Sequence, residues 1–278
     1  MRFVATVLLW LLATIALAVA VPGVWAQRNI IDANGYTGMA QKAATDPQLR
    51  AAVAEELANK ATALISEHGS RVDAARVHGV ASAYTAGPSF PSQFAQANRI
   101  AHSWAFAGTQ SGPDPWVVDL APMLNDTAFR QMLADYDVYL PATVTVPLTV
   151  SAPKALRPGE LHPLTTWGAW VSLAATVLTG TFAVLTLAAA RSRGRALASL
   201  GVSALMVGAV GYAGIEVARR HIDDALDHAS GDVRRVADAM VGYAEGSLHH
   251  WLDLTLVAGG ALVVFGALTA MVGGLRRA

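Results

Sequence analysis

Residues 166–190 read TWGAWVSLAATVLTGTFAVLTLAAA and contain no charged side chain. An apolar helix of about 20 residues crosses a hydrocarbon core about 30 Å thick. A helix also satisfies its own backbone hydrogen bonds, which lipid cannot do for an open extended segment. Three further stretches have the same apolar character, over residues 3–25, 196–217 and 251–275. The sequence therefore predicts a mainly α-helical membrane protein with four transmembrane helices.

The composition of the whole chain supports this class. Of its 278 residues, 54% are hydrophobic and 14% are charged, and the mean hydropathy is +0.39. Soluble domains carry about 25% charged residues. Because the formal net charge is zero, the chain lacks the basic surface that neutralises phosphates, and we expect no nucleic-acid partner. The absence of cysteine excludes disulfides and thiolate catalysis.

Arginine sets the expected orientation, because short cytoplasmic flanks of membrane helices carry an excess of basic residues. Basic residues lie before the first span, between the second and third, and after the fourth: Arg2, Arg191, Arg193, Arg195, Arg276 and Arg277. Indole rings favour the headgroup level and occur near the opposite ends of the spans, at Trp25, Trp167, Trp170 and Trp251. We therefore expect a plasma (inner) membrane protein with both ends in the cytoplasm.

The first span, residues 1–26, also has a second interpretation as a signal peptide. Val24-Trp25-Ala26 resembles a small-residue cleavage site after a charged start and an apolar run. The apolar run is longer than that of a usual signal peptide, which favours a retained transmembrane helix.

Residues 27–163 separate the first two spans and are long enough for a small extracytoplasmic domain. Asp46 and Pro47 have the chemistry of a helix start, an N-cap acceptor followed by proline. Apolar periodicity predicts helices from Pro47 to about Gly69, from Ser92 to Phe106 and from Thr127 to about Tyr136. Alternating residues predict strands over Trp116–Leu120 and Thr143–Val150, with Pro147 at an edge or bulge. We expect a mixed, mostly helical domain.

The later part of the chain divides into residues 164–218, 219–250 and 251–278. The first holds spans two and three with a short cytoplasmic loop, and the last holds span four and the cytoplasmic end. Between them, apolar residues recur at alternating spacings of four and three, which predicts a packed helical seam: Ile222, Leu226, Ala229, Val233, Val236, Met240 and Tyr243. Ser230-Gly231-Asp232 interrupts the seam, so we expect an outer helical hairpin, with one uninterrupted helix as the alternative.

Small residues recur at spacings of three and four in the spans, where they let membrane helices approach closely. We expect helix-packing or partner-docking faces at Gly208, Gly211, Gly214, Gly266, Ala270 and Gly274, and a similar set at Ser172, Thr176 and Gly180. Bundling within the chain and docking onto the membrane helices of a partner both explain this pattern.

The sequence offers little catalytic or transport chemistry. Glu216 and Asp253 are the only ionisable residues of the spans and lie at their ends, which disfavours a stand-alone transporter. No nucleophile elbow, Walker loop or metalloprotease motif occurs. His221, Asp224 and His228 share a helical face as metal ligands can, but the neighbouring arginines oppose a cation. We expect no enzyme activity, no cofactor and no metal.

Several stretches carry a resemblance: Val21–Ala26, Ile31–Tyr36, Asp46-Pro47, Ala97–His102 and Val117–Pro122. They are similar to a group of uncharacterised actinobacterial, mycobacterial-type membrane proteins with four spans and an outer domain after the first. Ala, Val, Gly and Arg are frequent in the chain and lysine is rare, which agrees with an actinobacterial source. Members of the group usually have a longer outer domain. The resemblance implies a cell-envelope setting and supplies no functional residues.

Two functions from different classes follow from these observations. The first is a non-enzymatic accessory or scaffold subunit of a larger envelope complex, because the cores of the spans are uncharged and the spans carry small-residue faces. Its most concrete form is an accessory subunit of an Mce-type lipid importer, since small four-span proteins of this kind occur in such assemblies. The second is a ligand-sensing or ligand-binding membrane protein acting through its outer domain, which a deep apolar pocket in that domain would favour.

Overall fold

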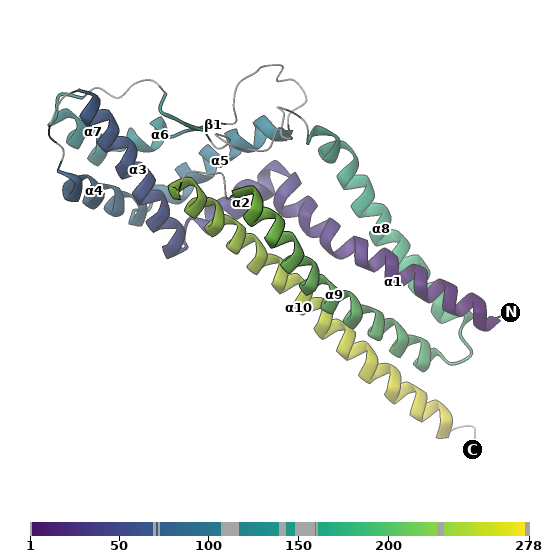
Figure 1. Cartoon of the computed structure of the whole chain (residues 1–278). Coiled ribbons are helices and arrows are strands. Elements are labelled where there is room, and N and C mark those ends of the chain that lie inside the picture. Colours follow the sequence, from purple (N-terminus) through teal and green to yellow (C-terminus); the bar gives the residue numbers. More distant parts are fainter. Residues whose placement is uncertain are drawn as a thin grey trace. The chain divides into compact units, whose positions relative to one another are not determined.

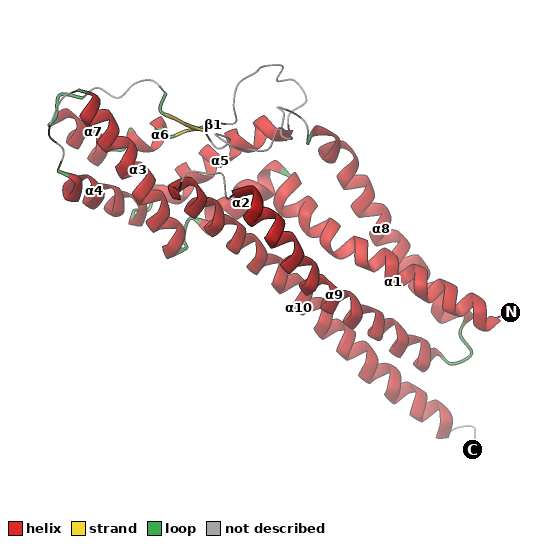
Figure 2. Cartoon of the chain, viewed as in Figure 1, coloured by secondary structure: helices red, strands yellow, loops and turns green. Residues whose placement is uncertain are grey.

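The computed structural model describes residues 2–68, 71, 73–106, 117–138, 143–147, 159, 161–226 and 231–275. These residues form two compact units (Figure 1). Unit 1 comprises Met1–Arg28, Leu164–Arg220 and Glu245–Ala278, and unit 2 comprises Asn29–Pro163 and His221–Ala244. Helices dominate both units, as Figure 2 shows. The two longest helices each contribute residues to both units.

Four long apolar helices form unit 1 and confirm the predicted number of candidate spans. They are α1 (Arg2–Ala26, continued by one π-helical turn, Gln27–Ile31), α8 (His162–Ala189), α9 (Arg193–Leu226) and α10 (Gly231–Leu275). Each is long and apolar enough to cross a membrane. The chain is therefore a multi-pass membrane protein in contact with the lipid bilayer.

Helices α9 and α10 approach each other backbone to backbone through glycine. A Cβ atom added at Gly201 would lie 2.6 Å from the carbonyl oxygen of Gly259, and one added at Gly194 would lie 2.5 Å from the backbone nitrogen of Ala270. Real Cβ atoms do not come so close to backbone atoms, so any side chain there would force the helices apart. Small residues thereby replace the hydrophobic driving force that lipid removes.

The small residues singled out from the sequence divide into three groups. Gly266 and Ala270 belong to the close α9–α10 contact, and Gly208 and Gly211 face the side chains of Leu256 and Leu252 on α10. An added Cβ at Gly214 or Gly180 meets nothing within 4 Å. The surroundings of Gly274 lie outside the described residues. The prediction missed Gly194, Gly201 and Gly259, which also take part in the close backbone contact of α9 with α10.

Polar side chains of α1 bond to α9 within unit 1. The indole nitrogen of Trp10 donates to the carbonyl oxygen of Ser199 at 2.9 Å, and the hydroxyls of Thr14 and Ser203 lie 2.7 Å apart. Ser203 is buried. Hydrogen bonds between helices stabilise membrane bundles by roughly 0.6 kcal/mol each, so these pairs fix which faces meet rather than dominating the stability.

Unit 2 consists of short helices, a pair of strands, the end of α9 and the first part of α10. The helices are α2 (Ala33–Ala43), α3 (Pro47–Glu67), α4 (Ala74–Ala86), α5 (Phe90–Phe106), α6 (Ala121–Leu124) and α7 (Thr127–Ala134). Strands β1 (Val117–Asp119) and β2 (Thr145–Pro147) pair antiparallel, with Val118 opposite Val146. Asp46 caps α3 by accepting from the amides of Gln48 and Leu49, the arrangement that the sequence predicts.

The three helices predicted in this domain are present as α3, α5 and α7, with small shifts at their ends. Helices α2 and α4 were not predicted, because their sequences contain glycine and few large apolar residues. Both begin at an aspartate cap, Asp32 and Asp73. The strands are shorter than predicted, and Trp116 and residues 148–150 lie outside the described part of the chain.

One hydrophobic core joins these elements. Its largest fully buried side chains are Leu49, Leu57, Ile65, Val77, Phe90, Met123, Leu124, Phe129, Met132 and Leu133. Val233 of α10 is a member, and Val236, Met240 and Tyr243 pack against it. The α10 half of the predicted seam therefore packs within unit 2.

The α9 half of the seam differs. Ile222 and Leu226 are only half-buried, and neither belongs to the described core. Helix α9 ends at Leu226 and α10 begins at Gly231, so this segment holds two helices rather than one uninterrupted helix. Ala229 and Ser230 lie outside the described residues.

We predict that Gly201→Ala destabilises unit 1 by about 1–3 kcal/mol, because the new methyl group meets backbone atoms that cannot rotate away. The measurement is thermal unfolding of the full chain in detergent. Gly260→Ala is the matched control, since an added Cβ there meets nothing within 4 Å. Equal melting temperatures for the two variants would contradict the backbone contact.

Candidate functional site

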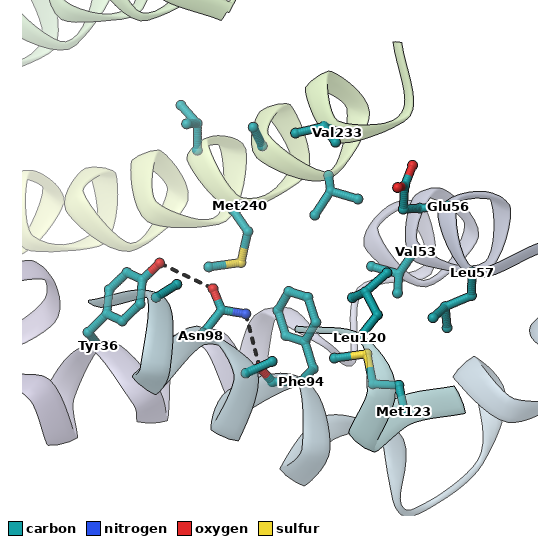
Figure 3. A pocket seen from close by; sticks show the side chains of 15 residues that line it. Tyr36, Val53, Glu56, Leu57, Phe94, Asn98, Leu120, Met123, Val233 and Met240 are labelled. Atoms are coloured by element: carbon teal, nitrogen blue, oxygen red, sulfur yellow. Dashed lines mark hydrogen bonds between the residues drawn. The ribbon is translucent and has the colours of Figure 1, made fainter. Parts of the chain in front are cut away.

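An apolar pocket of about 300 Å³ lies inside unit 2 (Figure 3). Its walls come from α2, α3, α5, the turn around α6 and the first part of α10. The lining residues are mostly aliphatic or aromatic: Tyr36, Val53, Glu56, Leu57, Phe94, Ala97, Asn98, Ala101, Leu120, Met123, Val233, Val236, Ala237, Met240 and Val241. Residues distant in sequence thus build one site.

Helical spacing explains how α5 and α10 form facing walls. Phe94, Ala97, Asn98 and Ala101 recur every three or four residues along α5, which places them on one face of that helix. The pocket residues of α10 follow the same rule from Val233 to Val241. The lining alanines of both helices have small side chains, so the space between α5 and α10 is not filled.

Two polar side chains meet at one end of the pocket. The Tyr36 hydroxyl donates to Oδ1 of Asn98 at 3.2 Å, and Nδ2 of Asn98 donates to the carbonyl oxygen of Phe94 at 3.0 Å. In Figure 3 the Met240 side chain points from α10 toward this pair. Burial raises the pKa of Tyr36, so its phenol is uncharged at neutral pH. This end of the pocket offers neutral hydrogen-bonding groups.

A single carboxylate lies at the other end. Figure 3 places Glu56 of α3 away from Tyr36, on the side of the pocket near Val53. Among the described lining residues there is no lysine, arginine or histidine. The described lining therefore offers no cationic side chain to a ligand.

A buried histidine, His102, packs against the ring of Tyr36. The rings of His102 and Tyr36 lie 4.9 Å apart, and His102 stacks on Phe106 with centroids 4.3 Å apart. Nε2 of His102 donates to the carbonyl oxygen of Ile30 at 2.9 Å. Burial lowers the pKa of His102, and the nearby Asp32 carboxylate opposes this shift only in part. The neutral imidazole thus holds the tyrosine ring in place.

The sequence identified only part of this site. Val233, Val236 and Met240 line the pocket, whereas Ile222 and Leu226 do not. The glycines and the alanine predicted as helix-packing faces all belong to unit 1, and none of them lines the pocket.

Tyr36, Asn98 and Glu56 were missed as site residues. Nothing in the sequence marks Tyr36 and Asn98 as neighbours. Only the fold brings α2 and α5 together.

The ionisable residues near the ends of the spans have partners within unit 1. Glu216 pairs with Arg220 at 3.0 Å, and the Tyr212 hydroxyl donates to Asp253 at 2.5 Å. Within the described residues, no group of three histidine, aspartate or glutamate side chains is placed to hold a metal ion. His228, part of the metal arrangement weighed from the sequence, lies outside them.

Comparison of the chain with protein-family models, with curated proteins and with solved structures finds no match.

We predict that unit 2 loses stability on acidification through about pH 6.5, the ordinary pKa of histidine. Burial lowers the pKa of His102 in the folded chain, so the unfolded chain takes up this proton first. The stability contributed by neutral His102 is complete above that pH and is lost as the pH falls below it. Hydrogen exchange of the α5 amides, followed between pH 8 and pH 5, measures the effect.

His102→Gln should flatten this pH dependence, because an amide group can still donate to Ile30 without titrating. His68→Gln, at an exposed position, should keep the slope of the wild-type chain. A wild-type slope in the His102→Gln variant would show that another group controls the acid response.

Proposed function

We propose that this chain is a non-enzymatic membrane protein that binds a single hydrocarbon chain of a lipid-like ligand in the pocket of unit 2. The carrying observation is the apolar pocket of about 300 Å³ with a few polar groups at its ends. Small-molecule sites are concave and mostly apolar, with a few placed polar groups and volumes of about 300–1,000 Å³. The pocket has each of these properties.

The size of the pocket supports one chain rather than a whole membrane lipid. An apolar cavity of about 150 Å³ accommodates benzene, and the pocket has about twice that volume. It is at the lower end of the range for small-molecule sites. A two-chain lipid would have to leave most of its surface outside.

Helix α10 gives the ligand a connection to the bilayer. Val233, Ala237 and Met240 line the pocket, and the same uninterrupted helix runs on to Leu275 as a candidate span. A ligand in the pocket therefore contacts a helix that also crosses the membrane. The described connection between α8 and α9 is only three residues long, so any output would pass through a partner.

A second candidate is the accessory or scaffold subunit of a larger cell-envelope complex, of which an Mce-type lipid importer is the most concrete form. Gly180 of α8 and Gly214 of α9 support it, because an added Cβ at either position meets nothing within 4 Å. Small residues left open on a span allow a helix of another subunit to approach closely. Lipid binding and subunit assembly are compatible in one protein.

The arginine distribution supports an orientation in the plasma membrane. We infer that both chain ends and the α8–α9 connection are cytoplasmic, since Arg2, Arg191 and Arg193 lie at these positions. Unit 2 is then extracytoplasmic, where a ligand from the envelope can reach it.

We predict that the full chain, purified from its native membranes in mild detergent, retains a ligand that native mass spectrometry resolves. Ala237→Phe should lower its occupancy by about tenfold or more, because a phenyl ring fills space on the pocket wall. Gly242→Phe is the matched control on the same helix, at an exposed position where an added Cβ meets nothing within 4 Å.

Equal ligand occupancy in both variants would place the ligand elsewhere and contradict the pocket assignment. The same preparation also tests the second candidate. A stoichiometric protein partner supports an accessory subunit, whereas a chain that runs alone as a monomer contradicts it.

Orientation is testable with single cysteines, because the chain has none of its own. We predict that a membrane-impermeant maleimide added to intact cells labels Ser66→Cys in unit 2 and leaves Ser192→Cys unlabelled. Both should react after the cells are permeabilised, which controls for thiol accessibility. Labelling of Ser192→Cys alone in intact cells would invert the orientation.

A further inference from the structure

We infer that the ligand is an uncharged single-chain lipid whose hydroxyl or carbonyl group bonds to Tyr36 and Asn98, rather than a fatty acid or another anionic lipid. This inference rests on the proposed function and adds the chemical class of the headgroup. It follows from the unused hydrogen-bonding capacity at one end of the pocket and from the lack of a basic side chain in its described lining.

The Tyr36–Asn98 pair has one donor and several lone pairs to spare. Asn98 uses one amide hydrogen on the carbonyl oxygen of Phe94 and one lone pair on the Tyr36 hydroxyl. Its second amide hydrogen and second lone pair remain, together with the lone pairs of the phenol oxygen. A ligand hydroxyl can accept from the amide and donate to either oxygen. A ligand with an ester or amide carbonyl can only accept a hydrogen bond, from the side-chain NH₂ group of Asn98.

An anionic headgroup fits this end poorly. A carboxylate only accepts hydrogen bonds, and a buried charge is costly unless it is paired. The described lining contains no basic side chain that could pair with the anion. A neutral headgroup avoids this penalty, and the surrounding apolar walls then favour its hydrocarbon chain.

The side chains of Tyr36 and Asn98 are already oriented before a ligand binds. The His102 ring packs against the Tyr36 ring, and the two ring centroids lie 4.9 Å apart. The hydrogen bond from Nδ2 of Asn98 to the carbonyl oxygen of Phe94 fixes the orientation of the Asn98 amide group. Burial raises the pKa of Tyr36, so the phenol keeps its proton. Groups that are already oriented lose little freedom on binding. The apolar lining residues beside this pair, such as Phe94 and Met240, provide the surface for the hydrocarbon chain.

The test uses the full chain in phosphatidylcholine nanodiscs and three photoreactive probes. Each probe is a sixteen-carbon chain with a diazirine, ending in an alcohol, a carboxylate or an amine. After irradiation at pH 7.5, mass spectrometry maps the adducts, and labels on α8 report the concentration of each probe in the bilayer. We expect the alcohol to label the pocket residues of α5 and α10 about tenfold more than the carboxylate, relative to α8.

Side-chain variants separate the hydrogen bonds from general stability. Tyr36→Phe should lower pocket labelling by the alcohol about fivefold and leave labelling by the carboxylate unchanged, as expected for one lost hydrogen bond. Tyr84→Phe is the matched control, because this buried tyrosine donates to Gln93 and does not line the pocket. It should label as the wild-type chain does.

The outcomes distinguish this inference from the proposed function. Equal pocket labelling by alcohol and carboxylate, with both suppressed in Ala237→Phe, overturns the inference and keeps the pocket as a lipid site. Strongest labelling by the amine, lost in Glu56→Gln, also overturns it in favour of a cationic ligand. Absence of pocket labelling by all three probes contradicts the proposed function itself.

Discussion

The need to satisfy every backbone polar group inside lipid is the constraint on which the structure depends. Water is absent from the hydrocarbon core, so a chain crossing it alone must be helical. The apolar stretches of this chain obey that rule as α1, α8, α9 and α10. Burying apolar surface does not hold such helices together, because lipid is as apolar as their side chains. Close backbone contact and a few hydrogen bonds between helices do so instead.

The spans and the capped helices could be predicted because their signals are local. A stretch of about 20 apolar residues has one stable form in lipid, and the aspartate and proline at the start of α3 specify a helix start wherever it packs. Helices α2 and α4 escaped prediction because alanine and glycine give no clear apolar stripe. The contact of Gly201 with Gly259 also escaped, since one sequence does not show which glycine faces which helix.

The pocket was the least predictable feature, although three of its residues belong to a predicted seam. An apolar seam shows that something covers a helix face, but it does not identify the covering element. Val233 and Met240 both contact the core of unit 2, and both also line the open pocket. The alanines on α5 and α10 are too small to fill that space. A sequence pattern that counts alanine as apolar cannot distinguish a filled interface from a hollow one.

The reciprocal contact of Gly201 and Gly259 restricts how this protein can change over generations. A Cβ added to either glycine would meet the carbonyl oxygen of the other, and that oxygen belongs to the backbone that all amino acids share. In an ordinary core, a larger side chain at one position can be accommodated by a smaller neighbour. Here no second substitution at the facing residue can make room, so the pair has no compensating partner and each position must independently remain glycine.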